Sequence, residues 1–260
     1  MSFQNLLIQN HNAVCTITVN RPDKLNALNR QTLAELRVAF EQAQNDQDIR
    51  VVVLAGSGDK AFIAGADISE LAKLSPLHAQ TFSRAGQQLM TQIERLGKPV
   101  IAKIQGFALG GGMEIAMSCT LRIASEKAKF GQPEINLGII PGFGGTQRLL
   151  RLAGRGAALE LCLLGHTIDA QRAFALGAVT RVVPHDELHA EVEKLSTQLA
   201  NSAPHALAGI IDAVLIGGEC GIDQGLEYET QAFALCCATE DMREGTKAFL
   251  ERRKAQFVGR

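Results

Sequence analysis

The sequence is poor in the aromatic side chains on which sugar rings commonly stack: it has no tryptophan and a single tyrosine, Tyr228. Such rings offer a flat apolar face and a polar edge. Two glutamates, Glu114 and Glu134, stand among apolar and small residues, and paired carboxylates also occur in glycosidases. The shortage of these rings argues against a carbohydrate site.

Net charge is nearly absent as well, because 26 Lys and Arg residues face 27 Asp and Glu residues, giving −1 at pH 7. Such a chain has no general attraction to nucleic acid or to an anionic membrane surface. No apolar run reaches the roughly 18 residues of a membrane span, and the start, Met-Ser-Phe-Gln-Asn, lacks the regions of a secretory signal. We expect no nucleic-acid partner, no membrane, and a bacterial cytoplasmic protein or, in a processed eukaryotic form, a mitochondrial matrix protein.

Metal and disulfide motifs are also lacking. The six cysteines show no Cys-x-x-Cys spacing, and the six histidines form no His-x-x-x-His pair. We therefore expect reduced, packed thiols and no metal site. The segment Gly56-Ser-Gly58-Asp-Lys-Ala61 fits a loose dinucleotide fingerprint, but no helix is expected before about Ile68, so it predicts a plain turn.

The 260 residues, 46% of them hydrophobic, suffice for one large domain or a domain with an appendage. Apolar patterning in the first half predicts strands and helices in alternation, an α/β fold with helices outside a sheet core. The expected strands are 6–8, 14–19, 51–54, 121–124 and one starting after Pro99, and the expected helices are 31–44, 81–96 and 113–119. The last third predicts only helices, at 154–164, 169–176, 186–200, 204–216 and finally 223–237, with a soft boundary near residue 196.

The stretch from Gly106 to Glu114, with the segment from Phe130 to Gly138, carries the strongest chemical signal. Glycines that open a helix can present backbone N–H groups to a developing negative charge. A carboxylate in apolar surroundings can have a raised pKa and exchange protons. The pattern alone also fits two solvated acids at helix starts. Because Glu114 and Glu134 are 20 residues apart, they can meet only through tertiary structure.

The chain resembles an enoyl-CoA hydratase of the crotonase (enoyl-CoA hydratase/isomerase) family over nearly its whole length. The resembling segments are Asn20-Arg-Pro-Asp-Lys-Leu-Asn-Ala-Leu28, Ala61-Phe-Ile-Ala-Gly-Ala-Asp-Ile68, Gln105-Gly-Phe-Ala-Leu-Gly-Gly-Gly-Met-Glu114, Phe130-Gly-Gln-Pro-Glu134, Gly138-Ile-Ile-Pro-Gly-Phe-Gly-Gly-Thr-Gln-Arg148 and the tail Ala238-Thr-Glu-Asp with Lys247-Ala-Phe-Leu-Glu-Arg252. Several ordered motifs make a chance resemblance improbable.

The resemblance implies a spiral of ββα units in residues 1–195 and a helical region in 196–260 that builds homotrimers, usually paired into hexamers. It implies the hydration of a 2-enoyl-CoA thioester to a 3-hydroxyacyl-CoA, with no cofactor because coenzyme A is part of the substrate. Glu114 would act as base on water and Glu134 would protonate C2. The backbone N–H groups of Ala66 and Gly111 would form the oxyanion hole.

The resemblance also implies contacts to the substrate and its coenzyme A portion. They fall on Lys24, Leu25, Ala27, Ala64, Ala66, Asp67, Ile68, Gly110, Pro133, Pro141 and Gly142, and on the tail residues Phe249 and Arg252, which reach a neighbouring subunit's ligand in the family. Where the family often has a phosphate-contacting lysine, this chain has Ser69. The run Arg252-Arg-Lys254 equally fits a solvated helix end.

Two other functions stay open. One is a different crotonase-type activity, such as an enoyl-CoA isomerase or a pathway-specific hydratase, although isomerases lack one of the two glutamates that this chain has. The other is RNA binding, known in one branch of the family, which the near-neutral charge disfavours. The sequence alone does not define the acyl chain length, which depends on segments such as 71–88 and 140–143.

Overall fold

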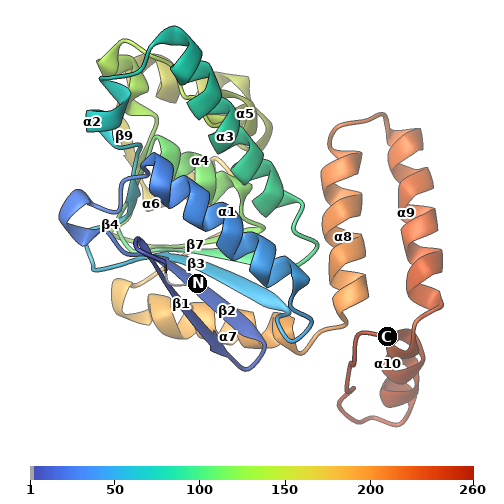
Figure 1. Cartoon of the computed structure of the whole chain (residues 1–260). Coiled ribbons are helices and arrows are strands. Elements are labelled where there is room, and N and C mark those ends of the chain that lie inside the picture. Colours follow the sequence, from blue (N-terminus) through green and yellow to red (C-terminus); the bar gives the residue numbers. More distant parts are fainter. Residues whose placement is uncertain (1–2) are drawn as a thin grey trace.

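A six-stranded sheet forms the base of the molecule in the computed structural model, which describes residues 3–260 (Figure 1). Its strands run in the order β1-β2-β3-β5-β7-β10, and only the β1–β2 pair is antiparallel. The bounds are β1 Leu6–His11, β2 Val14–Val19, β3 Val51–Gly56, β5 Val100–Ile104, β7 Leu121–Ser125 and β10 Arg181–Val183.

The buried side chains of these strands are the ones that the pattern of apolar residues predicts. In β2 every second side chain is buried, as the alternation of its residues predicts, while the apolar run of β3 is buried from Val51 to Ala55. The predicted strand 14–19 has the observed bounds, and 51–54 is two residues short.

A smaller sheet lies above the first and has the order β4-β6-β8-β9. Its strands are β4 Ala61–Ala64, β6 Phe107–Leu109, β8 Lys129–Gly131 and β9 Thr167–Asp169. Strands β4, β6 and β8 follow β3, β5 and β7 along the chain, and a helix follows each pair, so the fold is a spiral of strand–strand–helix turns. This confirms the expected α/β class and ββα spiral. The three-residue strands were not predicted, because such short segments carry no periodic pattern.

The helices of the spiral mostly begin earlier than their apolar spacing suggests. They are α1 Arg30–Asn45, α2 Ile68–Leu71, α3 Pro76–Glu94, α4 Gly111–Ser118 and α5 Gly145–Leu164. Ser75 caps α3 and Pro76 occupies its first turn, so the helix starts before residue 81. Helix α5 starts at Gly145 rather than at Gly154, which instead marks a kink with φ +80°.

The C-terminal part is helical, as expected. Helices α6 Ala170–Ala175 and α7 Leu188–Ala200 lie on the body, and α7 packs against the large sheet. Helices α8 Pro204–Gly217 and α9 Ile222–Cys237 form a hairpin that stands away from it (Figure 1). Helix α9 is not the last: α10 Glu240–Leu250 follows, capped by Thr239.

The six cysteines are all free thiols, but they are not all packed as the sequence predicts, because Cys220 is exposed in the turn between α8 and α9. Cys15 and Cys119 are buried in the main hydrophobic cluster, and burial raises the pKa of the Cys15 thiol to about 11 and that of Cys119 to about 12. These two thiols are therefore poor nucleophiles near neutral pH.

Between residues 3 and 260, no single helix has the length and apolarity to cross a membrane. The segments His185–Ala200 and Pro204–Gly217 meet that criterion only when taken together, and they are bent by 107° at the break between them.

Candidate active site

Glu114 lies in the first turn of α4, a helix whose eight residues are all buried. Its side chain is only 1% exposed. Oε1 accepts hydrogen bonds from the backbone N–H of Phe143 at 2.8 Å and of Gly145 at 2.6 Å. The burial rules out a solvated helix-start acid at Glu114 and leaves a carboxyl group held by two backbone donors.

Glu134 follows β8 in the 3-10 helix η2, Pro133–Leu137. Its Oε1 lies beside Gly110, where an added Cβ would approach to 2.6 Å and displace the carboxyl group. The backbone N–H of Gly110 donates to the carbonyl of Gly131 at 2.9 Å, which continues the β6–β8 pairing. The small sheet therefore brings together the two segments that carry Glu114 and Glu134.

Both carboxyl groups have a strongly raised pKa. Burial raises the pKa of Glu114 to about 7, and repulsion by the Glu134 carboxylate adds to this, while the bonds from Gly145 and Phe143 oppose it. Burial likewise raises the pKa of Glu134 to about 7. Near neutral pH each group can therefore give or take a proton, which is the property required of a general acid–base pair.

The backbone N–H groups of Ala66 and Gly111, like those of the next two residues in the first turn of α4, have no acceptor within residues 3–260. Gly111 is the first residue of α4, where helix geometry leaves the N–H unpaired. Ala66 forms an isolated parallel bridge with Leu28, in which only its neighbours Gly65 and Asp67 make the backbone bonds.

Close packing holds the two segments with these N–H groups together. A Cβ on Gly112 would lie 1.8 Å from the carbonyl oxygen of Ile63 in β4, so α4 starts directly against the strand that leads to Ala66. Free N–H groups at a helix start favour a negative charge. The site thus combines two proton-exchanging carboxyl groups with candidate donors for an oxyanion.

Comparison with known proteins identifies the fold and the family. The family model described as "Enoyl-CoA hydratase/isomerase" matches residues 9–260. The chain belongs to the enoyl-CoA hydratase/isomerase family. It is 44% identical over 260 residues to a protein of Syntrophomonas wolfei named crotonyl-CoA hydratase, with both chains fully covered. It is 43% identical to the short-chain-enoyl-CoA hydratase of Clostridium acetobutylicum, with 98% of each chain covered.

A solved structure has the same fold. The crystal structure of an enoyl-CoA hydratase from Bacillus anthracis superposes with a TM-score of 0.95 at 38% identity, covering 99% of this chain and 100% of the other. The crotonase-like fold expected from the sequence is therefore confirmed.

Two of the segments that the family resemblance predicts to contact coenzyme A, residues 24–27 and 64–66, lie side by side. The backbone N–H of Ala64 donates to the carbonyl of Leu25 at 3.0 Å, and that of Leu28 donates to Gly65 at 2.8 Å. Asn26, only 1% exposed, fixes the turn because its amide donates to the carbonyls of Ser57 and Ala61, each at 2.9 Å. Lys24, Leu25 and Ala27 are thus placed next to Ala64 and Ala66.

Asp67 directly follows Ala66 in the chain. It pairs with Arg21 at 2.9 Å and accepts a 2.7 Å bond from the hydroxyl of Ser69. The bond from Ser69 and then the bond from Arg21 lower the Asp67 pKa. Asp67 is the N-cap of α2, and Ser69, found where the family often has a lysine, donates to it through both its N–H and its hydroxyl. The neighbouring Ile68 is 59% exposed.

The remaining predicted residues divide into two groups. Pro133 directly precedes Glu134, and Pro141 and Gly142 lie in the loop that leads to Phe143 and α5, so all three are near the carboxyl pair in the chain. The tail residues are not near the pair: Phe249 is 84% exposed in α10, which lies beyond the α8–α9 hairpin and away from the body that contains α4 (Figure 1).

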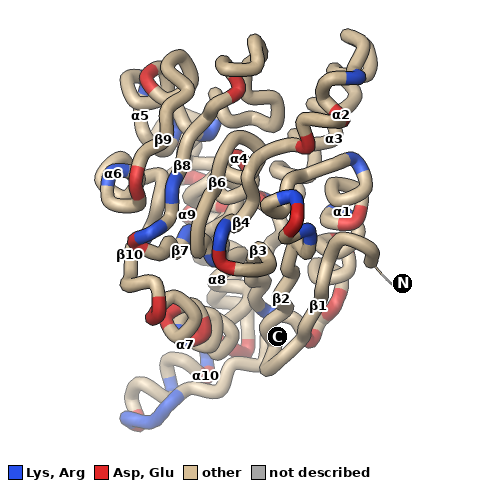
Figure 2. Tube along the Cα trace, turned by 90° about the vertical axis from the view of Figure 1, so that its left-hand side faces the viewer, with Lys and Arg blue, Asp and Glu red and all other residues tan. Residues whose placement is uncertain are grey.

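Arg252 is also exposed, in the basic segment after α10 that is visible at the lower edge of Figure 2. Beside it, Arg253 pairs with Glu244 and Glu251, each at 2.7 Å. A single chain thus does not bring the tail to the glutamates.

Sequence reasoning assigned no role to Gln132, whose side chain is fully buried. In the orientation that satisfies both ends of its amide, Nε2 donates to both Glu134 oxygens, at 3.1 and 3.2 Å. The sequence reasoning likewise assigned no role to the N–H groups of Phe143 and Gly145. Their position in a glycine-rich loop was the only signal, and such a loop does not say which group its backbone contacts.

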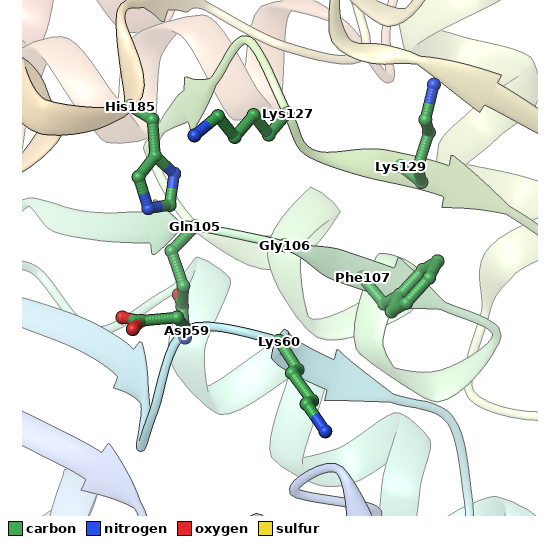
Figure 3. Close-up of a pocket in the computed structure, with 8 residues that line it drawn as sticks. All are labelled: Asp59, Lys60, Gln105, Gly106, Phe107, Lys127, Lys129 and His185. Carbon is green, nitrogen blue, oxygen red and sulfur yellow. The ribbon is translucent and has the colours of Figure 1, made fainter.

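A separate pocket of about 280 Å³ opens at the other end of the small sheet (Figure 3). It is lined by Asp59, Lys60, Gln105, Gly106, Phe107, Lys127, Lys129 and His185. In Figure 3, Lys127 points toward His185, while Lys60 and Lys129 point away to opposite sides. The pocket lies at the starts of β4, β6 and β8, whereas the glutamates follow the ends of β6 and β8. It is therefore not part of the site that contains Glu114 and Glu134.

Among residues 3–260, no cluster of His, Cys, Asp or Glu is arranged to hold a metal ion.

Proposed function

We propose that this chain is an enoyl-CoA hydratase that adds water reversibly across the 2,3 double bond of a short 2-enoyl-CoA thioester. The observation that carries the proposal is the pair formed by the buried Glu114 and the half-buried Glu134, each with a pKa of about 7, together with the unpaired N–H groups of Ala66 and Gly111. Membership of the family and relatives named as hydratases support it.

The thioester oxygen of the substrate is held by the N–H groups of Ala66 and Gly111. As water adds at C3, negative charge moves from the double bond onto this oxygen, giving an enolate-like state that the two donors stabilise. Removing one donor of this kind typically costs roughly 3–4 kcal/mol of transition-state stabilisation. Backbone donors suit the task because close approach is needed and no side chain is.

The two carboxyl groups manage the protons. Ionised Glu114 takes a proton from water while the oxygen of that water bonds to C3. Protonated Glu134 gives its proton to C2 as the enolate collapses. The product has gained one water, Glu114 is protonated and Glu134 is ionised, which is the arrangement required for the reverse elimination. Each such proton transfer contributes about 10²–10⁴ in rate.

No separate cofactor takes part in these steps, because the addition is redox-neutral and coenzyme A arrives with the substrate. The turn around Lys24–Ala27, together with Ala64–Ala66, supplies the backbone wall proposed to hold the adenine. Gln132 orients Glu134 through its amide.

We also propose that α8–α10 join copies of this chain into a trimer or a pair of trimers. Helices α8 and α9 bury no residue within the chain, and Val214, Ile222 and Phe233 are at least 70% exposed. Apolar area of this extent usually marks an interface. The predicted boundary at residue 196 falls inside α7, which packs on the large sheet, so α8–α10 are the helices available to a partner. Light scattering that shows only monomers would contradict this.

The activity itself is tested by incubating purified protein with 2-enoyl-CoA and 3-enoyl-CoA substrates and identifying the products. A hydratase converts the first to 3-hydroxyacyl-CoA. Conversion of the 3-enoyl thioester to the 2-enoyl isomer without hydration would instead indicate an isomerase. A salt-dependent gel shift with RNA, together with no turnover of any thioester, would favour the RNA-binding alternative.

A further inference from the structure

Phe143 is wedged between α3 and the start of α4. Its ring is packed against that of Phe82, with centroids 5.1 Å apart and planes tilted by 58°. One edge fills a notch at Gly86, where an added Cβ would lie 2.1 Å from the ring. The opposite edge is 3.4 Å from the corresponding position on Gly111. The ring is 3% exposed, so it fills space that Gly86 leaves open.

The backbone around Phe143 is held just as firmly. Its N–H donates to Glu114 at 2.8 Å. The carbonyl of the preceding Gly142 accepts bonds from Ser83 Oγ at 2.6 Å and from Gln87 Nε2 at 3.1 Å. Helix α3 therefore fixes both the ring and the loop, and the ring cannot withdraw without breaking contacts to α3.

The position of the ring relative to the reaction centre follows from these contacts. The ring lies 3.4 Å from the point where a Cβ on Gly111 would stand, and the N–H of Gly111 is proposed to hold the thioester oxygen. The backbone N–H of Phe143 holds Glu114, which is proposed to act at C3. If Glu114 and Gly111 act as proposed, acyl carbons beyond C3 continue on the Glu114 side of the thioester and extend toward the region that the Phe143 ring occupies.

We propose that Phe143, seated in the Gly86 notch, sets the acyl chain length by closing the apolar end of the site to long chains. This inference rests on the proposed hydratase function and identifies its substrate class as short 2-enoyl-CoA thioesters. A close-packed ring excludes an added chain sterically, whereas its removal leaves an apolar space in which further methylenes can be buried.

The test compares kcat/KM for crotonyl-CoA, hexenoyl-CoA, octenoyl-CoA and decenoyl-CoA in the wild type and in Phe143→Ala. The variant keeps the backbone N–H to Glu114, so its pH profile should match that of the wild type. We expect the wild type to prefer crotonyl-CoA and the variant to raise the decenoyl-to-crotonyl ratio of kcat/KM by about 10-fold or more, since a single methylene in an apolar pocket already discriminates by about 10–200-fold.

Phe82→Leu is the matched control, because it loosens the same ring pair without opening the space beside Gly111. It should leave the chain-length ratio near the wild-type value. Gly86→Ala is the converse variant: its methyl group would displace the ring from the notch, so turnover of even crotonyl-CoA should fall.

The outcomes separate this inference from the function it rests on. Absence of hydration of every 2-enoyl-CoA by the wild type would refute the proposed function. If the wild type had the same kcat/KM for decenoyl-CoA as for crotonyl-CoA, the proposed role of Phe143 would be wrong. An unchanged ratio in Phe143→Ala, or an equal change in Phe82→Leu, would also overturn that role.

Discussion

The backbone N–H of Phe143 donates to Oε1 of Glu114 across 2.8 Å, linking the loop before α5 to the buried first turn of α4. A second N–H, from Gly145, donates to the same oxygen. Oε2 of Glu114 makes no hydrogen bond to any of residues 3–260. The carboxyl group is thus oriented by the backbone through one oxygen, and the other is available to a water molecule.

Replacing either carboxyl group with an amide should abolish proton transfer without removing bulk. We expect Glu114→Gln and Glu134→Gln each to lower kcat by about 10²–10⁴, with unchanged far-UV circular dichroism. Glu126→Gln, at an exposed position, is the matched control and should retain full activity. Near-wild-type turnover in either active-site variant would refute the role assigned to that glutamate.

The pH dependence of kcat/KM should be bell-shaped with its maximum near pH 7, because the pKa values of Glu114 and Glu134 are both raised to about 7. Activity requires one ionised and one protonated group, so it falls when both are protonated and when both are ionised. The two limbs describe the coupled pair and not single residues. A flat profile between pH 5 and pH 9 would contradict this picture.

The free energy of unfolding should also depend on pH through the buried carboxyl group of Glu114. Its pKa in the folded chain lies above the ordinary value of 4.5, so the native state keeps a proton that the unfolded state releases. The contribution of Glu114 to the free energy of unfolding is therefore fully present below about pH 4.5 and is lost as the pH rises to about 7, by up to about 3 kcal/mol.

Glu114→Gln removes this titration. The stability of the variant relative to the wild type should increase from pH 5 to pH 8 in urea unfolding measured at several pH values. A difference that does not change with pH would show that Glu114 is ionised at no cost in the folded protein.

Gly111 allows a direct test of one oxyanion donor. It is the first residue of α4, a position that tolerates proline, and an added Cβ would meet only ordinary contacts, 3.4 Å to Phe143 and 3.5 Å to Leu28. Gly111→Pro removes the N–H and should lower kcat by about 10²–10³. Gly111→Ala adds the Cβ but keeps the N–H, so it should remain far more active; equal activity of the two variants would exclude a role for this donor.

The sequence predicted the regular parts of this architecture because their patterns are local. Strand 14–19 alternates apolar and polar residues, and the final helical third has clear apolar spacing. The short strands β6 and β8 carry no such pattern, and α3 begins at its cap rather than at its apolar stripe. Motif resemblance, rather than periodicity, pointed to Ala66 and Gly111.

The contacts that hold the two glutamates in place could not be predicted from the sequence. Glu114 and Glu134 were identified as a candidate pair, yet the hydrogen bond from Phe143 and the amide of Gln132 depend on how distant loops meet. The fit of the Phe143 ring into Gly86 joins residues 57 positions apart. Contacts of this kind arise only when the tertiary structure forms.

The most direct measurement is the steady-state hydration of crotonyl-CoA by the purified protein, followed as loss of enoyl-thioester absorbance and confirmed by identifying 3-hydroxybutyryl-CoA. The account predicts rapid, reversible turnover by the wild type and none above background by the Glu114→Gln/Glu134→Gln double variant. No absorbance loss with crotonyl-CoA or any longer 2-enoyl-CoA, in a correctly folded protein, would contradict it.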